Sequence, residues 1–438
     1  MTLYHARRRF IICLLTLALL PFLNSCNSQV DGDLVLFAPL FSTSTYLVDK
    51  DNHVVKEWSS QYQAGQSAYL LEDGSILRAG QTRDADNFFV KAIAELPNMA
   101  LGFNVGGIVE RISAANQVEW RFSFFGNSLM PHHDVELLPN GNVLLIAWEY
   151  KTPRQAIEAG RDPSLVTKNG LWVDAIFEIE PIGEAGGKVV WEWHSWDHMA
   201  QDFDPTKDNY GALSENPGKL NINHEGHVLL AADLMHANSI TYIKEWDQVI
   251  LSSYNFSEFY IIDHSTTSAE AAGESGGKYR RGGDFLYRWG NPSNYGVKGS
   301  RAFTLAGVHD PNWIEESGHI IMYDNNVKRG SSRVVEIVPP RLPDGTYEMR
   351  PDGYYGPVSP LYTADLGFQE PVVGAAQRLD SGNTFSCECT KNRAVQLAPD
   401  GSILENRNVA EYVPLKTPGA FRLIAYPRNF EGVKRALR

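Results

Sequence analysis

Residues 133–145, HDVELLPNGNVLL, contain the pattern that decides the fold. A histidine opens a hydrophobic run, an Asn-Gly pair follows, and a second hydrophobic run comes after it. Because Asn and Gly accept positive φ, this pattern predicts a β-hairpin. Similar strand–turn–strand units open at His236 (HANSITY) and at His309 (HDPNWI). Each unit has a histidine at its start.

A second kind of segment carries a tryptophan signature. Each such segment is a short hydrophobic strand that follows another strand. Two further pairs of strands are similar but lack the tryptophan. Six groups of strands result. The related loops GEAGGK at 183–188 and GESGGK at 273–278 support an origin by duplication. The tryptophan strands are VVKEW at 54–58, VEWRF at 118–122, VVWEW at 189–193 and FLYRW at 285–289.

Four short strands per unit, repeated along the chain, are typical of propeller blades. We therefore predict an all-β fold, a six-bladed β-propeller with loop insertions near 195–225 and 268–283. The terminal strands at 34–37 and 421–426 could pair within one blade and close the ring. A large β-sandwich assembly is the alternative. The blade tryptophans are expected in the core between blades.

The N-terminus has the features of a targeting segment. Three arginines at 7–9 precede an apolar run at 10–22, and Leu-Asn-Ser-Cys follows at 23–26. This resembles a bacterial lipobox, so we predict a lipoprotein signal peptide at 1–26, lipidation of Cys26 and a single propeller domain at 27–438. An ordinary cleaved signal or an uncleaved anchor is the alternative. We expect an exported lipoprotein on the periplasmic side of the cell envelope, and Asn27 favours the outer membrane.

Composition excludes some partners. No later stretch reaches the roughly 20 apolar residues of a membrane helix, so we expect membrane contact through the lipid only. The net charge of −13 argues against nucleic acid as a partner.

Cys387 and Cys389 are predicted to be two positions on one strand, with roughly parallel side chains. We therefore predict free thiols.

In a radially symmetric fold, equivalent positions meet near the axis. We therefore predict that His133, His236 and His309 form one site. Imidazole can act as nucleophile or base, and imidazolium as acid, near neutral pH. His194 and His198 are four residues apart but lack the glutamate of a metalloprotease motif. We expect neither a metal site nor a cofactor.

The three histidine blocks, in this order, resemble the bacterial arylsulfotransferase (aryl-sulfate sulfotransferase) family, from about residue 60 to 412. The resemblance implies a six-bladed propeller with its site at the central channel. It also implies sulfuryl transfer from a phenolic sulfate ester to a phenolic acceptor through a sulfohistidine, without the nucleotide donor PAPS. In this reading His309 is the nucleophile, His236 stabilises the transferring group or the leaving phenolate, and His133 contacts the sulfuryl oxygens.

One position departs from the family pattern. Better-known members have an arginine shortly after the second histidine, and here Tyr254 stands at that place. A tyrosine hydroxyl donates one hydrogen bond and has no permanent charge. Either another arginine reaches the substrate, with Arg333 and Arg288 as candidates, or the substrate differs, or sulfotransfer is lost. The alternatives are a lipid-anchored binding module and a transferase or lyase acting on other sulfated or phenolic compounds.

Overall fold

The computed structural model describes residues 33–95, 106–225, 230–327, 329–413 and 419–438. The predicted signal segment 1–26 and the predicted lipidation site Cys26 lie outside these residues. Within the described ranges, no helix is both long and apolar enough to cross a membrane. The division into 1–26 and 27–438 stays a prediction.

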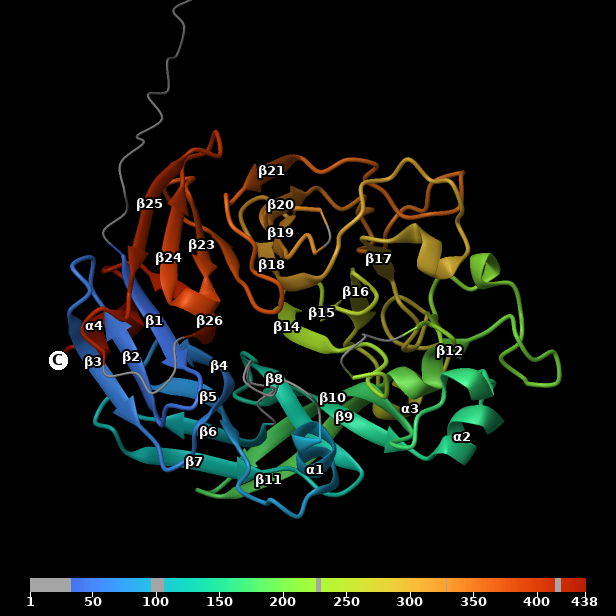
Figure 1. The fold of residues 1–438 in the computed structure, drawn as a ribbon, viewed down its shortest axis with the longest axis horizontal. Coiled ribbons are helices and arrows are strands. Elements are labelled where there is room, and N and C mark those ends of the chain that lie inside the picture. The colour runs from blue at the N-terminus through green and yellow to red at the C-terminus, as the bar shows by residue number, and fades with distance from the viewer. Residues whose placement is uncertain (1–32, 96–105, 226–229, 328, 414–418) are drawn as a thin grey trace, which may run out of the picture.

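Four separate four-stranded antiparallel sheets surround a common centre (Figure 1). In each sheet, the first strand given below is the innermost. The strands are β26 (Ala420–Tyr426), β1 (Leu34–Pro39), β2 (Ser44–Val48) and β3 (Val54–Ser59); β14 (Ala237–Ile243), β15 (Gln248–Ser253), β16 (Glu258–Asp263) and β17 (Tyr287–Trp289); β18 (Val308–Ile314), β19 (His319–Asp324), β20 (Arg333–Ile337) and β21 (Tyr362–Asp365); and β22 (Ala376–Arg378), β23 (Thr384–Glu388), β24 (Arg393–Leu397) and β25 (Ile403–Asn408).

A fifth, eight-stranded sheet completes the propeller-like arrangement. It consists of two antiparallel groups of four, which are joined by one parallel bridge between Gln66 and His133. The prediction of six blades is thus met in part, because four sheets are separate and the remaining eight strands share one sheet. These strands are β4 (Ala64–Leu70), β5 (Ile76–Gln81), β6 (Gly107–Ile112) and β7 (Val118–Ser123), then β8 (Leu129–Leu137), β9 (Val143–Lys151), β10 (Leu171–Ile182) and β11 (Gly186–His194).

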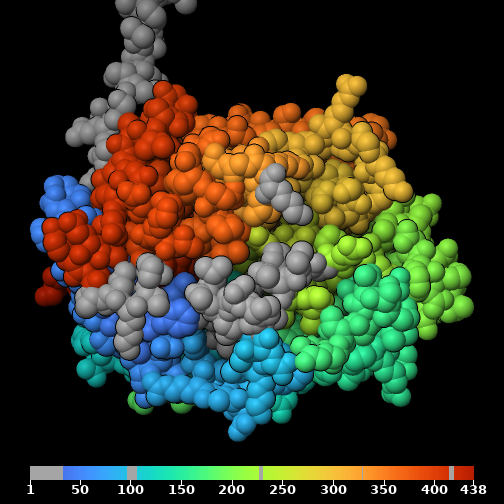
Figure 2. Space-filling model, in the orientation of Figure 1, coloured from blue at the N-terminus to red at the C-terminus, as the bar shows by residue number. Residues whose placement is uncertain are grey.

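The two ends of the described chain meet in one sheet. The C-terminal strand β26 pairs antiparallel with β1, with Leu36 opposite Ile424, as the sequence predicts. In Figure 2 the sectors follow one another around the molecule, and the red C-terminal sector lies beside the blue N-terminal one. Strand β26 therefore occupies the inner position of a sheet whose other strands come from the start of the propeller.

The signature tryptophans fill the space between neighbouring sheets. Trp120, Trp193 and Trp289 are buried. The indole N–H of each donates to a backbone carbonyl of a later segment, at Gly186, Gly283 and Pro357 respectively. A buried indole needs such an acceptor. The prediction that these residues are core between blades is confirmed.

The remaining elements are short and lie in the connections. Thr152 and Thr267 cap their helices through capping boxes with Gln155 and Glu270. The predicted insertion near 195–225 contains only brief elements among irregular chain. These connecting elements are the helices α1 (Phe88–Ala94), α2 (Pro153–Glu158), α3 (Ser268–Ala271) and α4 (Glu431–Ala436), the two-residue strands β12 (Met199–Ala200) and β13 (Leu220–Asn221), and 3-10 turns at 163–165, 195–198, 213–215, 292–295 and 389–391.

Cys387 and Cys389 form a disulfide, so the prediction of free thiols is wrong. That prediction placed both residues on one extended strand. Instead, β23 ends at Glu388 and Cys389 begins a 3-10 turn. Glu388 has φ −96° and ψ 78°, which bends the chain. The bend brings the two Cα atoms to 5.1 Å, within the range that a disulfide spans.

Candidate active site

Three inner strands, β8, β14 and β18, lie beside the centre of the ring (Figure 1). His133 lies in β8, His309 lies in β18, and His236 directly precedes β14. His133 and His309 are buried, and the His236 side chain is 13% exposed. The structure therefore brings the three side chains together, while their catalytic roles stay predictions.

Five rings form a closed set of contacts, which we call the aromatic circuit. The centroid distances are 4.7 Å from His133 to His236, 5.9 Å to Tyr254, 5.6 Å to His309, 5.9 Å to Phe421 and 5.5 Å back to His133. The planes meet at 62° to 75°, an edge-to-face arrangement that aromatic rings favour. Phe421 comes from β26, so the closing strand supplies one ring of the site.

Left-handed backbone occurs at the same place. His133 has φ 59° and His236 has φ 51°, values that residues other than glycine rarely adopt. In the third unit the positive φ falls on Asp310, at 53°, and not on His309. The three histidines are therefore not at strictly equivalent positions, because each lies at a different place relative to the register shift in its strand. His236 precedes the shift that begins at Ala237, His309 opens its own shift, and His133 lies inside the shift between Pro131 and Val135. Strained residues of this kind concentrate at functional sites.

His309 is a buried neutral imidazole with a defined tautomer. The amide nitrogen of Asn325 donates to the carbonyls of Glu370 and Val373, at 2.7 and 2.8 Å. Its oxygen therefore faces His309 Nδ1, at 2.7 Å, and must accept the proton on that atom. The lone pair is then on Nε2, which makes no hydrogen bond of good geometry among the described residues. The backbone of Val372 also lies close to the ring, and its effect on the pKa of His309 is smaller than that of burial. Burial lowers the pKa of His309 to about 3.

His236 has the opposite charge preference. Its Nδ1 lies 2.6 Å from Asp233 Oδ2, and its backbone N–H donates to Oδ1 of the same carboxylate. Burial alone would lower the pKa of His236, but the charge and hydrogen bond of Asp233 outweigh burial and raise it. The Asp233 contact also supports the positive φ of His236. His236 is thus the residue of the circuit that favours the imidazolium form.

His133 is held by a neighbour that the sequence analysis missed. The Nδ1 atoms of His132 and His133 are 2.7 Å apart, and Trp148 stacks on His132 at 4.0 Å. His132 Nε2 lies 3.0 Å from Asp174 Oδ1. Burial lowers the pKa of His132 to about 3 and, with the charge of Asp233, raises the pKa of Asp174. Burial therefore keeps His132 neutral near neutral pH and disfavours the charged form of Asp174.

Tyr254 lies between His236 and His309 in the circuit, while its role in substrate binding stays a prediction. Its hydroxyl donates to the carbonyl of Pro371 at 2.6 Å. Burial raises the pKa of Tyr254 to about 12, so the hydroxyl stays protonated near neutral pH. Tyr254 thus contacts the backbone of the loop at 370–373, whose carbonyls at Glu370 and Val373 also accept from Asn325.

The two candidate arginines have other partners. Arg333, on the third strand of its sheet, binds Asp324 at 2.8 Å and stacks over Phe303. Arg288 is fully buried and binds Glu258 within its own sheet. Neither set of contacts includes a ring of the aromatic circuit. The predicted role of Arg333 in substrate binding stays a prediction.

Arg422, next to Phe421 on β26, is a buried cation that the sequence analysis missed. It forms ion pairs with Asp134 at 3.2 Å and with Asp310 at 3.1 Å. Burial alone would lower the pKa of Arg422, but these two carboxylates raise it. One signal was present in the sequence, since Arg422 is the one charged residue in the apolar run FRLIAY at 421–426.

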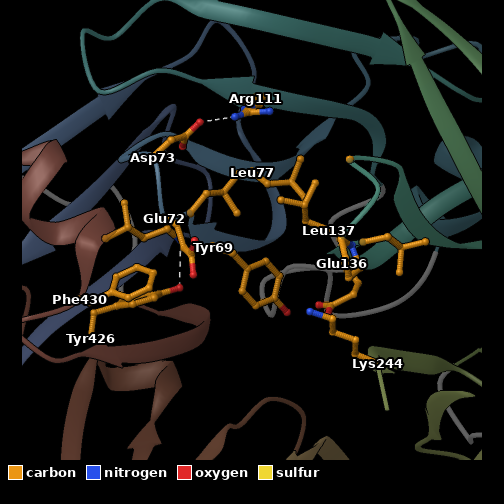
Figure 3. A pocket seen from close by; sticks show the side chains of 15 residues that line it. Tyr69, Glu72, Asp73, Leu77, Arg111, Glu136, Leu137, Lys244, Tyr426 and Phe430 are labelled. Carbon is orange, nitrogen blue, oxygen red and sulfur yellow. Dashed lines mark hydrogen bonds and ion pairs between the residues drawn. The ribbon is translucent and has the colours of Figure 1, made fainter. Parts of the chain in front are cut away.

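A cavity of about 620 Å³ is lined by residues at the hairpin ends of β4 and β8 (Figure 3). Figure 3 shows Tyr69, Glu136 and Lys244 pointing toward one another there. Tyr69 donates to Asp134 at 2.6 Å. Glu136 is three residues beyond His133, about 10 Å along a strand. Burial, helped by the charge of Asp134, raises the pKa of Glu136 to about 8. Tyr69 therefore lines the cavity and also contacts Asp134, the residue that follows His133.

One group of side chains has the spacing of metal ligands. Ligand atoms of Asp49, Asp51 and His53 lie within 4.8 Å of one another, around the turn between β2 and β3. Asp51 and His53 are exposed, and Asp51 pairs with Lys50. We assign no metal to this group.

Comparison with known proteins agrees with the histidine blocks. The sequence profile of the arylsulfotransferase (ASST) family matches residues 117–336, half of the chain. The chain belongs to the arylsulfotransferase family. The matched segment of this arylsulfotransferase-family chain contains His133, His236, Tyr254 and His309, while Phe421 and Arg422 lie beyond it. Family membership supports a sulfotransferase function in general terms. No curated protein matches the chain.

Two solved structures illustrate the structural likeness of this arylsulfotransferase-family chain. A protein of unknown function from Bacteroides caccae has 10% identity and a TM-score of 0.47, covering 90% of this chain and 99% of that one. The periplasmic gluconolactonase of Pseudomonas aeruginosa has 9% identity and a TM-score of 0.43, covering 90% and 98%. Both TM-scores are below 0.5, so no conclusion is based on them.

Proposed function

We propose that this chain is a PAPS-independent aryl-sulfate sulfotransferase that moves a sulfuryl group from a phenolic sulfate ester to a phenolic acceptor. The observation that carries the proposal is His309. It is a buried neutral imidazole whose Nδ1 proton is held by Asn325 and whose Nε2 lone pair makes no hydrogen bond of good geometry in the described structure. A nucleophile of this kind needs no deprotonation before it attacks.

In the first half-reaction, His309 Nε2 attacks the sulfur of the aryl sulfate. The N–S bond forms as the bond between sulfur and the phenolic oxygen breaks. The leaving phenolate takes a proton from the His236 imidazolium. Because Asp233 engages Nδ1 of His236, the proton delivered is the one on Nε2. The products are sulfo-His309, neutral His236 and a phenol.

In the second half-reaction, an acceptor phenol attacks the sulfur of sulfo-His309. Its proton passes to His236 as the N–S bond breaks, which restores both histidines. Protons and charge balance over the cycle without a further reactant. The raised pKa of His236 supports its role as acid in the first half, and its carboxylate partner supports its role as base in the second.

The chain from Asp174 through His132 to His133 would orient a donor toward the sulfuryl oxygens. His132 Nε2 lies 3.0 Å from Asp174 Oδ1, and His132 Nδ1–H can donate to His133 Nδ1. His133 would keep its proton on Nε2, where it can stabilise the negative charge that develops on the transferring group.

Tyr254 affects which aryl sulfate donors the site can accept. The place of the family arginine is taken by a neutral hydroxyl that binds the carbonyl of Pro371. In this proposal the cation next to the sulfuryl group is His236, and its charge depends on pH. Such a site favours donors with good leaving groups, because less stabilisation of the phenolate is then required.

The finer points of architecture and location belong to the same proposal. Each four-stranded half of the eight-stranded sheet counts as one blade, which gives six blades around the site. We also propose an exported lipoprotein, anchored through Cys26 on the periplasmic side of the envelope. Globomycin-sensitive processing and metabolic labelling with a palmitate analogue would test this anchor, and a Cys26→Ala chain that is still labelled would refute it.

The first test uses the chain from residue 27 with 4-nitrophenyl sulfate, with and without phenol. We expect release of nitrophenolate that depends on phenol, and a sulfuryl adduct on His309 when phenol is omitted. A His53→Ala chain is the matched control, because that histidine is exposed and remote from the circuit. Absence of release and of adduct across a panel of aryl sulfates would overturn the proposal and favour the binding-module reading.

A further inference from the structure

We infer that Arg422 is the positioning residue of this site. By binding the carboxylates of Asp134 and Asp310, it holds the facing histidines His133 and His309 in the geometry that sulfuryl transfer requires. The inference rests on the proposed function and adds to it a residue outside the histidine blocks and outside the segment that matches the family.

The two carboxylates are direct chain neighbours of the two histidines. Asp134 follows His133 on β8, and Asp310 follows His309 on β18. Arg422 reaches both from β26, with Nη2 on Asp134 and Nη1 on Asp310. A planar guanidinium offers several donors in a fixed geometry, so it can bridge two carboxylates at a set separation. Movement of either carboxylate would move the adjacent histidine.

One connected network around Arg422 reaches all six inner strands. Each contact involves a side chain of Arg422, Asp134 or Asp310, so these three residues form its centre. The contacts are Arg422 on β26 with Asp134 on β8, Asp310 on β18 and the hydroxyl of Tyr69 on β4; Asp134 with the backbone N–H of Ile240 on β14 at 3.1 Å; and Asp310 with the backbone N–H of Ala376 on β22 at 3.1 Å.

Arg422 acts through the histidines and does not serve as the missing substrate-binding arginine. Both of its Nη atoms are engaged by Asp134, Asp310 and Tyr69. Two carboxylates already compensate the positive charge of Arg422, so it would attract an anionic sulfate donor only weakly. Burial raises the pKa of Asp310, and Arg422 opposes this rise. The charge of Arg422 also lowers the pKa of both His133 and His309, which favours the neutral nucleophile.

The test compares Arg422 with a matched arginine. Arg288 is equally buried and bound by a carboxylate, Glu258, but its partners lie within one sheet and the loop beside it. We expect Arg422→Lys to lower kcat about 100-fold with a KM change under about threefold, because the rotatable ammonium on a shorter side chain cannot hold both carboxylates at the fixed separation that a planar guanidinium sets, and small displacements of reacting groups are costly. Arg288→Lys should lower Tm by a similar amount and leave kcat within about threefold.

A second variant keeps the test decisive if Arg422→Lys folds poorly. Asp310→Asn retains the size of the side chain but has no charge and only one acceptor oxygen, which cannot serve both Arg422 and the N–H of Ala376 as the two carboxylate oxygens do. We expect it to lower kcat by about tenfold or more. Wild-type kcat in a folded Arg422→Lys or Asp310→Asn chain would overturn the inference. An equal loss of kcat in Arg288→Lys would also overturn the inference. The loss in Arg422→Lys would then reflect only the destabilisation that follows from changing any buried arginine.

An NMR titration separates this inference from the proposed function. In the wild-type chain the His309 imidazole should stay neutral down to about pH 4. In Arg422→Met, two uncompensated carboxylates replace a bridged pair, so the His309 pKa should rise by at least about one unit. Arg288→Met should leave it unchanged. A wild-type chain that transfers no sulfuryl group defeats the proposed function alone, whereas an unchanged His309 titration in Arg422→Met defeats the positioning role.

Discussion

His309 and His236 belong to the same aromatic circuit, yet their surroundings give them opposite charge preferences. The Nδ1 atom of His309 meets the amide oxygen of Asn325, and that of His236 meets the carboxylate of Asp233. An amide fixes a tautomer without stabilising an added proton, while a carboxylate stabilises the imidazolium. Burial lowers the pKa of His309, and Asp233 raises the pKa of His236 against the effect of burial.

This difference assigns roles without reference to any relative. Two titratable groups whose environments separate their pKa values are suited to nucleophile and acid. In the proposed function, His309 would be the nucleophile because burial keeps its imidazole neutral, and His236 would be the acid because Asp233 favours its imidazolium form. The predictions below alter one side of the pair at a time.

Loss of His309 should have the largest effect. We expect His309→Ala to reduce turnover of 4-nitrophenyl sulfate by more than about 10⁴-fold, as for other nucleophiles that act as part of a unit. No adduct should form at any histidine. Intact-mass analysis and near-ultraviolet circular dichroism would check the loss and the fold. Turnover above one per cent of the wild-type rate would remove His309 from the mechanism.

Changing the partner of His236 should shift the pH profile. In the wild type, kcat/KM for the donor should fall as pH rises through the raised pKa of His236, because the imidazolium is lost. It should show no acid limb above about pH 4, because burial keeps His309 neutral. Asp233→Asn removes the carboxylate that raises the pKa of His236, so the descending limb should move to lower pH by at least about one unit. An unshifted limb would show that another group is the acid.

Changing the partner of His309 should make it resemble His236. Asn325→Asp places a carboxylate beside Nδ1, so the pKa of His309 should rise and an ascending acid limb should appear in kcat/KM. The variant also loses the two donors that bind Glu370 and Val373, which we expect to cost about 1–3 kcal/mol of unfolding free energy. Urea denaturation would measure this cost. Activity near pH 7 should fall about tenfold, and Asn325→Ser is the uncharged control.

Tyr254 lies between the two histidines and should matter less. Tyr254→Phe loses one hydrogen bond to Pro371, worth about 1 kcal/mol, and kcat should stay within about threefold. Tyr254→Arg should raise the salt sensitivity of donor binding by adding a cation. A loss above tenfold in Tyr254→Phe would instead show that the hydroxyl contacts the substrate.

His264 provides a reference outside the circuit. It lies between the carboxylates of Glu178 and Asp247, which outweigh burial and raise the pKa of His264 to about 9. The pKa of His264 in the folded chain exceeds its unfolded value near 6.5. The contribution of His264 to the free energy of unfolding is therefore complete below about pH 6.5 and is lost as pH rises through about 9. The loss should be about 3 kcal/mol at most. His264→Ala should flatten the decline in urea-unfolding free energy between pH 6 and 9.5 and leave kcat unchanged.

Much of the fold was predictable because its signals are local. The tryptophan strands predicted the outer strands, and the Asn-Gly turn at 140–141 predicted an inner hairpin. The two terminal strands predicted the pairing that closes the ring. The continuity of the eight-stranded sheet was not predictable. It depends on one bridge between Gln66 and His133, both with positive φ, and such local backbone geometry leaves no periodic signal.

The site was predictable in its histidines and not in their partners. Repeats place His133, His236 and His309 at one radius, but the atoms that set their charges come from outside the repeat pattern. Arg422 is separated from Asp134 by 288 residues, and Asn325 follows a strand end where no regular spacing applies. The disulfide was missed for a similar reason, since the bend at Glu388 interrupts the strand that the sequence suggested.

The position of β26 makes the aromatic circuit depend on the last inner strand along the described chain. During synthesis every other inner strand emerges before it, and folding can proceed from the N-terminal side. Phe421 and Arg422 are nevertheless supplied last. A product truncated before residue 420 would retain all the histidines but lack one ring of the aromatic circuit and the centre of the network. Premature termination or proteolytic trimming of the tail should therefore yield a protein that is detected by antibody and inactive toward donor.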